Sequence, residues 1–429
     1  MAVARVGTLI VGASQAGVQL AASLRELGDD EPILLVGSEP RPPYQRPPLS
    51  KAYLSGKATA DSLVLRSPEW YAGKRIDLRL STPIASIDLD PPSGGSGVAT
   101  TRYGEELGFA RLALTVGGRA RRLRVPGADL DGVCYLRHLR NADELRERLA
   151  VAAHVVVIGG GFIGLEAAAA ATGVGKDVTV VDIADRLLGR AVAPVVSEFY
   201  SDAHQRRGTR VLLRAGVAAI EAASATASAT ASDGGRVGGV RLADGRLLPA
   251  DLVLVGIGLE PRTELAEQLG LEIDNGIVVD SCARTSNPAV VAAGDCTTLP
   301  HPLTGEGRLR IESVQNAIAQ AQAAAASLLG RPAATPAVPW FWSDQADLKL
   351  QIAGLSHGYD QVVVRGAPLS ERFSVLYYAA DKLIAVDAIN TPRDYMVARK
   401  VLGEGGTLPA DRVADASVPL KELAATVLR

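Results

Sequence analysis

Two glycine-rich turns of the same design occur in the chain, 147 residues apart. The first reads GASQAG from Gly12 to Gly17, and the second reads GGGFIG from Gly159 to Gly164. Each follows a short apolar run with strand character and precedes an alanine-rich stretch with helix character. The glycines of such a turn let the backbone approach a pyrophosphate, which the amides at the helix N-terminus can bind. Two turns therefore predict two bound dinucleotides, with a hydride passing from one to the other.

Length and composition exclude several classes of protein. With 429 residues the chain can form two or three domains, and a formal net charge of -2 argues against a general nucleic-acid binder. Cys134, Cys282 and Cys296 lie far apart without CxxC spacing, so no disulfide framework, zinc site or iron–sulfur site is expected. No apolar run of about 18 residues and no basic leader occurs, so we expect a cytoplasmic protein.

The order of the predicted elements indicates an α/β chain with two β–α–β units. The first unit combines strands at 8–11 and 33–36 with a helix at 18–27, and the second extends from Val155 to Asp182. Further strand-like runs that end in glycine or aspartate occur at 112–118, 252–258 and 290–295.

Two later segments differ in composition from the rest. The stretch from Ala222 to Gly235 is of low complexity and is expected to form the tip of a hairpin. After Arg331-Pro332 apolar and polar residues alternate, which indicates a smaller α+β domain. The aromatic run Trp340-Phe341-Trp342 is expected in the core of that domain.

Acidic residues near the ends of predicted strands are candidates to bind sugar hydroxyls. Glu39 follows the second strand, 22 residues after Gly17, where a carboxylate would accept hydrogen bonds from a ribose; the alternative is a solvated loop acid. Asp295 ends a later strand, where it would bind a ribityl chain or cap a helix. Ser14 takes the middle position of the first glycine motif, where glycine is usual, and its small side chain still permits close approach.

Asp182 predicts which nicotinamide dinucleotide the second motif binds. It ends the strand that follows the motif, 18 residues after Gly164. A carboxylate here pairs with a ribose 2'-hydroxyl and repels a 2'-phosphate. The next residues, Ile183 and Ala184, provide no arginine to offset that repulsion, so we expect NADH rather than NADPH. Arg186 could be merely a surface charge.

Lys51 and Glu166 are the candidate catalytic residues. The loop from Pro40 to Lys51 contains five prolines, which stiffen it and hold Lys51 in a defined place. A fixed ammonium beside a cofactor that receives a hydride would stabilise the negative charge of its reduced form. Glu166 follows Gly164 by two residues and would face the mouth of a nicotinamide site. From the residues alone, an ordinary surface lysine is an equally good interpretation of Lys51, and a glutamate without a catalytic role is a somewhat better interpretation of Glu166.

Six motifs, in the same order along nearly the whole chain, resemble the FAD-dependent oxygenase-coupled ferredoxin reductases. They are Gly12-x-Ser14-x-x-Gly17, Arg46-Pro47-Pro48-Leu49-Ser50-Lys51, the second glycine motif with Glu166, Gly294-Asp295, Arg310-Ile311-Glu312-Ser313-Val314-x-Asn316-Ala317 and Pro339-Trp340-Phe341-Trp342-Ser343-Asp344-Gln345. The resemblance implies a glutathione-reductase-like fold of two Rossmann-like dinucleotide-binding domains with a C-terminal α+β domain. We expect the FAD domain at 1–116 and 259–333, the NADH domain at 117–258 and the C-terminal domain at 334–429.

The resemblance also implies roles for individual residues. It pairs Lys51 with Glu166 beside the flavin and lets Glu166 orient the nicotinamide amide. Relatives often carry an acid where this chain has Ser38, so either Ser38 or Glu39 holds the FAD ribose. No metal ligands are expected, and the expected cofactor-binding residues are Gly12, Ser14, Ala16, Gly17, Ser38, Glu39, Arg46, Pro47, Lys51, Ile84, Thr115, Gly117, Arg137, Asp295, Val314, Gly159, Gly161, Phe162, Ile163, Gly164, Glu166, Asp182, Arg190 and Gly258.

The electron acceptor follows partly from the cysteines. No cysteine precedes Cys134, so a thiol relay beside the flavin is excluded, and the flavin must discharge directly. The resemblance implies a 2Fe-2S ferredoxin that in turn serves a haem or Rieske oxygenase. An arginine-rich segment, residues 119–124, would steer an acidic ferredoxin or form a solvated inter-domain loop.

Other functions stay open. A rubredoxin reductase or NADH oxidase would share the first half-reaction. A flavin-bearing binding scaffold resembling apoptosis-inducing factor would need a basic surface, which a net charge of -2 does not favour. A membrane quinone reductase would need a basic amphipathic C-terminal helix, and Val418 to Arg429 is short and mixed in charge.

Overall fold

The computed structural model describes residues 5–90, 94–223, 235–302, 305, 307–332 and 338–428. Residues 224–234, in the expected hairpin tip, lie outside this set. Contacts divide the chain into two compact units, each built from three segments. The first unit comprises Met1–Gln45, Leu63–Arg119 and Glu260–Phe341, and the second comprises Arg46–Ser62, Ala120–Leu259 and Trp342–Arg429.

The first unit is built on a seven-stranded sheet in the order β3-β2-β1-β6-β5-β4, with β18 also paired to β6. Its strands are β1 (Arg5–Val11), β2 (Ile33–Val36), β3 (Ile76–Arg79), β4 (Ile84–Leu89), β5 (Gly97–Thr101), β6 (Glu106–Leu114) and β18 (Val290–Ala292). The strands β3, β2, β1, β6 and β18 are parallel. Because carboxyl ends of parallel strands meet at one edge, Gly12, Thr115 and Asp295 follow strands that end at the same edge.

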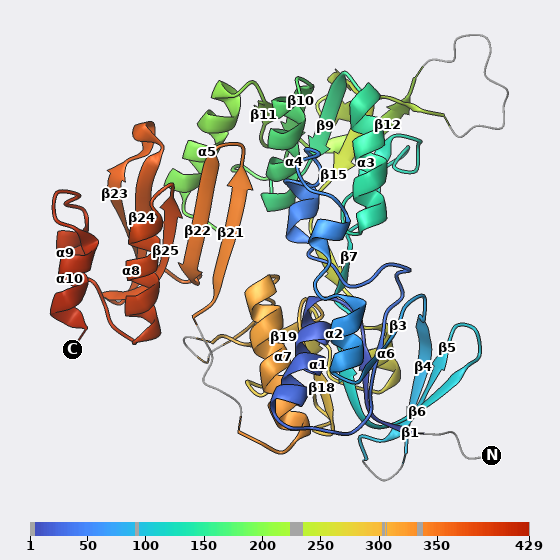
Figure 1. Cartoon of the computed structure of the whole chain (residues 1–429). Coiled ribbons are helices and arrows are strands. Elements are labelled where there is room, and N and C mark those ends of the chain that lie inside the picture. The colour runs from blue at the N-terminus through green and yellow to red at the C-terminus, as the bar shows by residue number, and fades with distance from the viewer. Residues whose placement is uncertain are drawn as a thin grey trace. The chain divides into compact units, whose positions relative to one another are not determined.

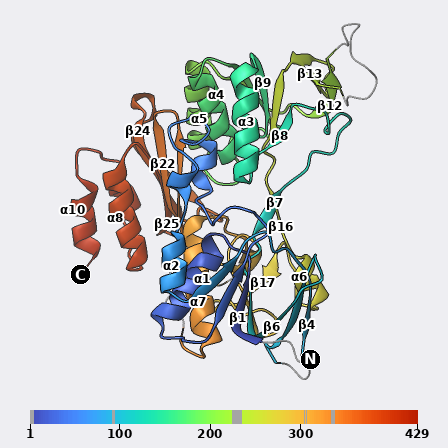
Figure 2. The ribbon, with the colours of Figure 1, turned by 45° about the vertical axis from the view of Figure 1, so that its right-hand side comes forward.

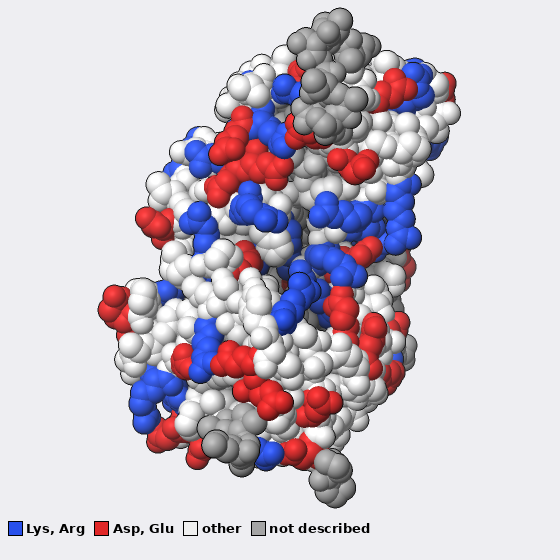
Figure 3. Space-filling view, turned by 90° about the vertical axis from the view of Figure 1, so that its right-hand side faces the viewer, with Lys and Arg blue, Asp and Glu red and all other residues white. Residues whose placement is uncertain are grey.

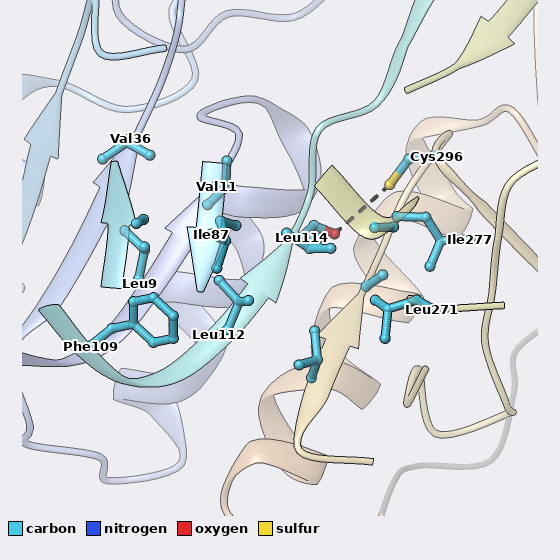
Figure 4. Close-up of a cluster of buried hydrophobic side chains, with 14 of the residues drawn as sticks. Leu9, Val11, Val36, Ile87, Phe109, Leu112, Leu114, Leu271, Ile277 and Cys296 are labelled. Atoms are coloured by element: carbon cyan, nitrogen blue, oxygen red, sulfur yellow. Dashed lines mark hydrogen bonds between the residues drawn. The ribbon is translucent and has the colours of Figure 1, made fainter. Parts of the chain in front are cut away.

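Both faces of this sheet are covered, which explains the continuous apolar run at the end of β1. Helices α1 (Gln15–Glu26) and α7 (Val314–Leu328) lie side by side on one face, against Ile10 (Figures 1 and 2). The other face carries Leu9, Val11 and Phe109, which form a separate buried cluster with Cys296 (Figure 4). Smaller elements complete the unit: α2 (Pro68–Gly73), α6 (Glu264–Gln268), β17 (Ile277–Val278), β19 (Thr297–Pro300) and β20 (Arg308–Leu309). The short helix η2 (Asp61–Leu63) spans the point in the chain where a segment of the second unit ends and one of the first begins.

The second unit contains a five-stranded parallel sheet in the order β11-β10-β9-β15-β8. Its strands are β8 (Val133–Tyr135), β9 (His154–Ile158), β10 (Asp177–Val181), β11 (Arg210–Leu212) and β15 (Leu252–Val255). The accompanying helices are α3 (Leu139–Val151), α4 (Phe162–Gly173) and α5 (Pro194–Arg206), and an antiparallel sheet holds β12 (Val217–Ala222), β13 (Val237–Leu242) and β14 (Leu247–Pro249). Two further strands, β7 (Gly118–Ala120) and β16 (Leu259–Pro261), pair with each other.

The second unit also contains the C-terminal sheet, in the order β21-β22-β25-β24-β23. Its elements are β21 (Trp340–Gln345), β22 (Leu348–Gly354), β23 (Gln361–Ala367), η3 (Pro368–Ser370), β24 (Arg372–Ala379), β25 (Lys382–Ile389), α8 (Pro392–Gly403), α9 (Ala410–Val413) and α10 (Leu420–Val427). The expected α+β character of this region is confirmed. The expectation that Trp340, Phe341 and Trp342 form its core is wrong, because all three are only half-buried on the edge strand β21. In the described ranges, no helix has both the length and the apolar composition needed to cross a membrane.

Candidate active site

The first glycine motif makes a turn that only glycine fits. Gly12 adopts a φ of +122°, and a Cβ there would lie 2.2 Å from the carbonyl oxygen of Thr115. A Cβ on Gly17 would lie 2.1 Å from the carbonyl oxygen of Gly12. The Thr115 hydroxyl donates to that same carbonyl at 2.8 Å, which fixes the turn against the end of β6. The start of α1 is thereby held close to the carboxyl edge of the sheet.

The second glycine motif repeats this geometry in the second unit. Gly159 has a φ of +112°, and a Cβ on Gly164 would lie 2.1 Å from the carbonyl oxygen of Gly159. Gly161 differs, because a Cβ there would meet no protein atom within 4 Å. Gly161 is the N-cap of α4, so the open space lies at a helix N-terminus, a kind of position that suits an anionic group such as a pyrophosphate. Phe162 and Ile163, also expected to bind a cofactor, form the first turn of that helix.

Residues expected at the first cofactor converge behind the first motif. Ala16 packs with Ala293 and Ala317, and a Cβ on Gly294 would lie 3.2 Å from the Ala16 Cβ. Asp295 follows Gly294 directly and is half-buried. Val314 begins α7, whose N-cap Ser313 accepts a hydrogen bond from an amide of the first turn. The structure therefore brings Ala16 and Asp295 to neighbouring positions.

Gln320 provides an observation that fits a bound polar group in this region. Its Oε1 accepts hydrogen bonds from the Gly294 amide at 2.8 Å and from the Asn316 side chain at 3.2 Å. These donors fix the orientation of the side-chain amide. Its Nε2 is buried and has no hydrogen-bond partner among the described residues. A buried donor without a partner is costly, and a ligand oxygen would satisfy it. The turn and this donor together fit a dinucleotide.

The remaining residues expected in the first unit are more scattered. Glu39 is half-buried and its Oε2 accepts a hydrogen bond from the Tyr44 hydroxyl at 2.6 Å, whereas Ser38 is exposed. Gly117 follows β6 with a φ of +63°, and Ile84 begins β4, where it packs against the buried cluster of Leu9. The structure thus gives Glu39 a fixed side chain near the end of β2.

The proline-rich segment joins the second unit through Arg46. The Arg46 guanidinium donates to the carbonyl oxygen of Arg137 at 2.7 Å, which brings two expected residues together. Pro47 opens the short helix η1 (Pro47–Ser50), which contacts α3 and α4. These contacts hold Lys51, the residue after η1, beside the start of α4.

Asp182 is tied to the second glycine motif. Its Oδ2 accepts a hydrogen bond from the Gly160 amide at 2.6 Å, and its Oδ1 accepts one from the Ala184 amide at 2.9 Å. The Arg190 guanidinium lies 3.7 Å from where a Cβ on Gly258 would lie, so these two expected residues also approach each other. The carboxylate is thus held in place at the end of β10.

Arg186 has a structural task that the sequence did not indicate. Its guanidinium donates to the carbonyl oxygen of Val192 at 2.6 Å and to that of Gly189 at 2.5 Å. These bonds brace the loop that carries Arg190. Carbonyl partners of this kind have no sequence pattern, which is why Arg186 could be taken for a surface charge.

The centre of the second unit is a buried ion pair. The Lys51 ammonium lies 2.9 Å from Oε2 of Glu166, and their side chains are 15% and 3% exposed. Two hydroxyls add to the pair: Ser50 donates to Oε2 at 2.5 Å, and Ser343 donates to Oε1 at 2.6 Å. Both serines lie inside the motifs that carry the family resemblance, yet the sequence indicated no role for either. Three donors therefore hold one carboxylate in a fixed orientation.

Two of the three cysteines are buried thiols of low reactivity. Burial raises the pKa of Cys134 to about 12 and that of Cys296 to about 11. Cys296 belongs to the buried cluster of the first unit, with its Sγ 3.8 Å from the carbonyl oxygen of Leu114 (Figure 4). Thiols with raised pKa values are not nucleophiles at neutral pH. Among the described residues, no group of His, Cys, Asp and Glu side chains is placed to hold a metal ion.

The arginine-rich segment is partly neutralised by its neighbours. Arg119 forms ion pairs with Glu260, at 3.3 Å, and with Glu264. The Arg122 guanidinium stacks over Tyr135, 4.1 Å from the ring centroid. The face drawn in Figure 3 carries basic and acidic side chains interspersed. These contacts give the segment a structural role in addition to any steering of a partner.

The structure thus combines two Rossmann-like units, each with one glycine-rich turn, and a buried lysine–glutamate pair in the second unit. Residues 7–321 match the family model described as pyridine nucleotide-disulphide oxidoreductase, and residues 340–424 match the reductase C-terminal model. The chain belongs to the pyridine nucleotide-disulphide oxidoreductase family and, within it, to the oxygenase-coupled ferredoxin reductases. The expected resemblance and fold class are thereby confirmed.

Individual relatives match over almost their whole length. Rhodocoxin reductase from Rhodococcus erythropolis is 44% identical over 413 residues, which cover 96% of this chain and 93% of the relative. Putidaredoxin reductase from Pseudomonas putida is 41% identical over 420 residues, which cover 97% and 96%. The crystal structure of the covalent putidaredoxin reductase–putidaredoxin complex matches with a TM-score of 0.92 at 40% identity and covers 99% of both chains.

Proposed function

We propose that this flavoprotein is an NADH:ferredoxin oxidoreductase that supplies electrons to a haem or Rieske oxygenase through a 2Fe-2S ferredoxin. Its cofactors are FAD and NADH. When bound, FAD accepts two electrons as a hydride and releases them singly. The observation that carries the proposal is the buried Lys51–Glu166 pair at the start of the helix that the second glycine motif opens. We place the reaction in the cytoplasm, where NADH is regenerated.

The residues of the first unit are proposed to hold FAD. The turn at Gly12 and Gly17 would admit the pyrophosphate to the N-terminus of α1. Glu39, with its side chain fixed by Tyr44, would accept hydrogen bonds from the adenosine ribose. Asp295, at the same edge of the sheet, would bind the ribityl chain. We also propose that the FAD domain comprises residues 1–116 and 259–333, the NADH domain residues 117–258 and the C-terminal domain residues 334–429.

The residues of the second unit are proposed to hold NADH. Gly161 leaves room for a pyrophosphate at α4, and Asp182 would pair with the ribose 2'-hydroxyl. Because a 2'-phosphate would meet the same carboxylate, NADPH should bind more weakly. Lys51 would supply a fixed positive charge for the electrons that arrive, and Glu166 would orient the nicotinamide amide. Most of the acceleration would come from holding the two rings in contact.

The state of two of the three cysteines, Cys134 and Cys296, supports direct transfer to a one-electron acceptor. Relay through a thiol requires a thiolate that can attack. Cys134 and Cys296 are buried with raised pKa values, so neither suits that role. A 2Fe-2S ferredoxin accepts one electron at a time and is therefore the matching partner.

An anaerobic titration followed by an acceptor assay tests the proposal. NADH should bleach the bound flavin, and cytochrome c reduction should be fast only when a 2Fe-2S ferredoxin is added. Fast reduction of cytochrome c without ferredoxin would contradict the assignment. Rapid oxygen consumption with NADH alone would instead indicate an oxidase, and a preference for rubredoxin would indicate a rubredoxin reductase.

A further inference from the structure

A chain of buried hydrogen bonds extends from Glu166 into the C-terminal sheet. Ser343 Oγ donates to Glu166 Oε1 at 2.6 Å, Gln345 Nε2 lies 3.2 Å from Ser343 Oγ, and His204 Nε2 lies 2.8 Å from Gln345 Oε1. The four residues are 4%, 0%, 1% and 3% exposed. Ser343 and Gln345 are two apart on β21 and so share one face of the strand. The first strand of the C-terminal sheet therefore contacts both α4 and α5.

The chemistry of the groups sets one direction for all of these bonds. A carboxylate only accepts, so the single proton of Ser343 is given to Glu166. Ser343 must then accept from the amide nitrogen of Gln345, which turns the amide oxygen towards His204. The Nε2 of His204 must therefore carry a proton. Burial, reinforced by Arg207, lowers the pKa of His204, although the bond to Gln345 opposes this shift. A neutral ring with its proton on Nε2 satisfies every member of the chain.

The lone pairs of the Glu166 carboxylate can be matched to their donors in the same way, which shows the one that has no donor among the described residues. Oε2 accepts from the Lys51 ammonium at 2.9 Å and from the Ser50 hydroxyl at 2.5 Å, which occupies both of its lone pairs. Oε1 accepts only from Ser343 among the described residues. The remaining lone pair of the carboxylate is therefore on Oε1, and its direction depends on where Ser343 holds that oxygen.

We propose that Ser343, backed by Gln345 and His204, is a positioning residue that aims the last acceptor site of Glu166 at the carboxamide N–H of the nicotinamide. This inference rests on the proposed function. It makes the first strand of the C-terminal sheet part of the hydride-transfer site. Without the Ser343 hydroxyl, Oε1 would have two open lone pairs and the carboxylate could turn, so the carboxamide would lose its defined partner.

A pair of variants with matched volume separates this role from packing. Ser343→Thr keeps the hydroxyl, and Ser343→Val has the same shape without it. With NADH, we expect S343T to reduce the flavin within about twofold of the wild-type rate. In S343V we expect the ratio of the flavin-reduction rate to the Kd for NADH to fall by about tenfold or more. This is the size of effect expected for a lost hydrogen bond to a charged group.

The nucleotide supplies the matched control. The 3-acetylpyridine analogue of NADH carries a methyl ketone in place of the carboxamide and has no N–H to donate. We expect S343T and S343V to reduce the flavin equally with this analogue. The inference would be overturned if S343T and S343V reduced the flavin at equal rates with NADH. It would also be overturned if S343V were slower than S343T by the same factor with NADH and with the analogue. Failure of NADH to reduce the wild-type flavin would instead overturn the proposed function.

The protonation of His204 gives a readout independent of activity. The chain has five histidines, so nitrogen NMR of the holoenzyme labelled only at histidine gives few signals. Comparison with His204→Gln assigns the signal of interest. We expect a proton on Nε2 and a neutral ring at pH 8, with a pKa of His204 below that of an ordinary histidine because the ring is buried. An Nε2 without a proton would reverse the bond order and overturn the inference, even if the Ser343 variants failed to fold.

Discussion

The ammonium of Lys51 lies 2.9 Å from the carboxylate of Glu166, although the two residues are 115 positions apart in the chain. The short helix η1 carries the lysine to its place, and α4 carries the glutamate. Removing two charges from water costs several kcal/mol per ion, so a buried pair is a poor source of stability. Its persistence in this chain is better explained by a role in electron transfer.

Replacement of Lys51 by methionine tests that role. Lys51→Met keeps the length of the side chain and removes its charge, so we expect flavin reduction by NADH to slow by roughly 100-fold and the flavin potential to fall. Stopped-flow bleaching and a redox titration measure the two effects. Lys57→Met, an exposed lysine of the same segment, is the control and should behave as wild type. A wild-type rate in K51M would remove Lys51 from the mechanism.

Two glycines of the second motif should respond in opposite ways to the same substitution. Gly161 has a φ of -82° and no protein atom within 4 Å of an added Cβ, so Gly161→Ala should lower the melting temperature only slightly, through the preference of an N-cap for glycine over alanine. The methyl would occupy pyrophosphate space, so the KM for NADH should rise about tenfold or more.

Gly164→Ala places its Cβ 2.1 Å from the Gly159 carbonyl, so it should destabilise the fold by about 1–3 kcal/mol. Calorimetry and NADH kinetics on both variants check this contrast. Gly173→Ala, at the open C-terminal end of α4, is the control. A melting temperature that falls equally in G161A and G164A would refute the contrast.

Asp182 should set the preference between the two nicotinamide nucleotides. Asp182→Asn removes the charge and keeps one acceptor oxygen, so one of the two amides that Asp182 binds, that of Gly160 or that of Ala184, loses its partner. We expect the ratio of kcat/KM for NADH over NADPH to fall by about tenfold, because repulsion of the 2'-phosphate disappears. Asp185→Asn, an exposed acid of the same loop, should leave the ratio unchanged. A wild-type preference for NADPH would disprove the assignment.

Much of the fold could be predicted because its signals are local. The apolar runs around each glycine motif give the parallel strands, and the steric demands of Gly12 and Gly159 are the same in both units. The first helix begins at Gln15, three residues before its expected start, because the turn at Gly12 and not the apolar pattern decides where it begins. Local patterns thus fix elements well and their ends less well.

The partners of Glu166 could not be predicted because they come from distant segments. Ser343 is 177 residues from Glu166, and no local pattern records such a contact. On β21 the aromatic residues Trp340 and Trp342 are half-buried, whereas the polar Ser343 and Gln345 are fully buried. Hydropathy favours the reverse order. Both of these buried polar side chains on β21 have hydrogen-bond partners, which removes the penalty that hydropathy assumes.

Asp387 should make the stability of the protein depend on pH. It is fully buried on β25; its Oδ2 accepts from the Tyr377 hydroxyl, and its Oδ1 has no hydrogen-bond partner among the described residues. Burial raises the pKa of Asp387 to about 7, although the bond from Tyr377 opposes the shift. An unfolded aspartate has a pKa of about 3.9, so the folded state binds this proton more tightly. The stabilisation is present in full below about pH 4 and is lost as the pH rises through about 7.

Asp387→Asn removes this titration and keeps an oxygen for Tyr377. We therefore expect the wild-type free energy of unfolding to fall between pH 5 and pH 8 relative to that of D387N, by up to about 3 kcal/mol. Calorimetry of both proteins at the two pH values measures the difference. Asp381→Asn, at an exposed turn before β25, is the control and should follow the wild type at both values. If D387N and wild type differ by the same amount at pH 5 and pH 8, Asp387 does not take up a proton in the folded state over this range, and its burial as a charged group must be offset by contacts other than the Tyr377 hydroxyl.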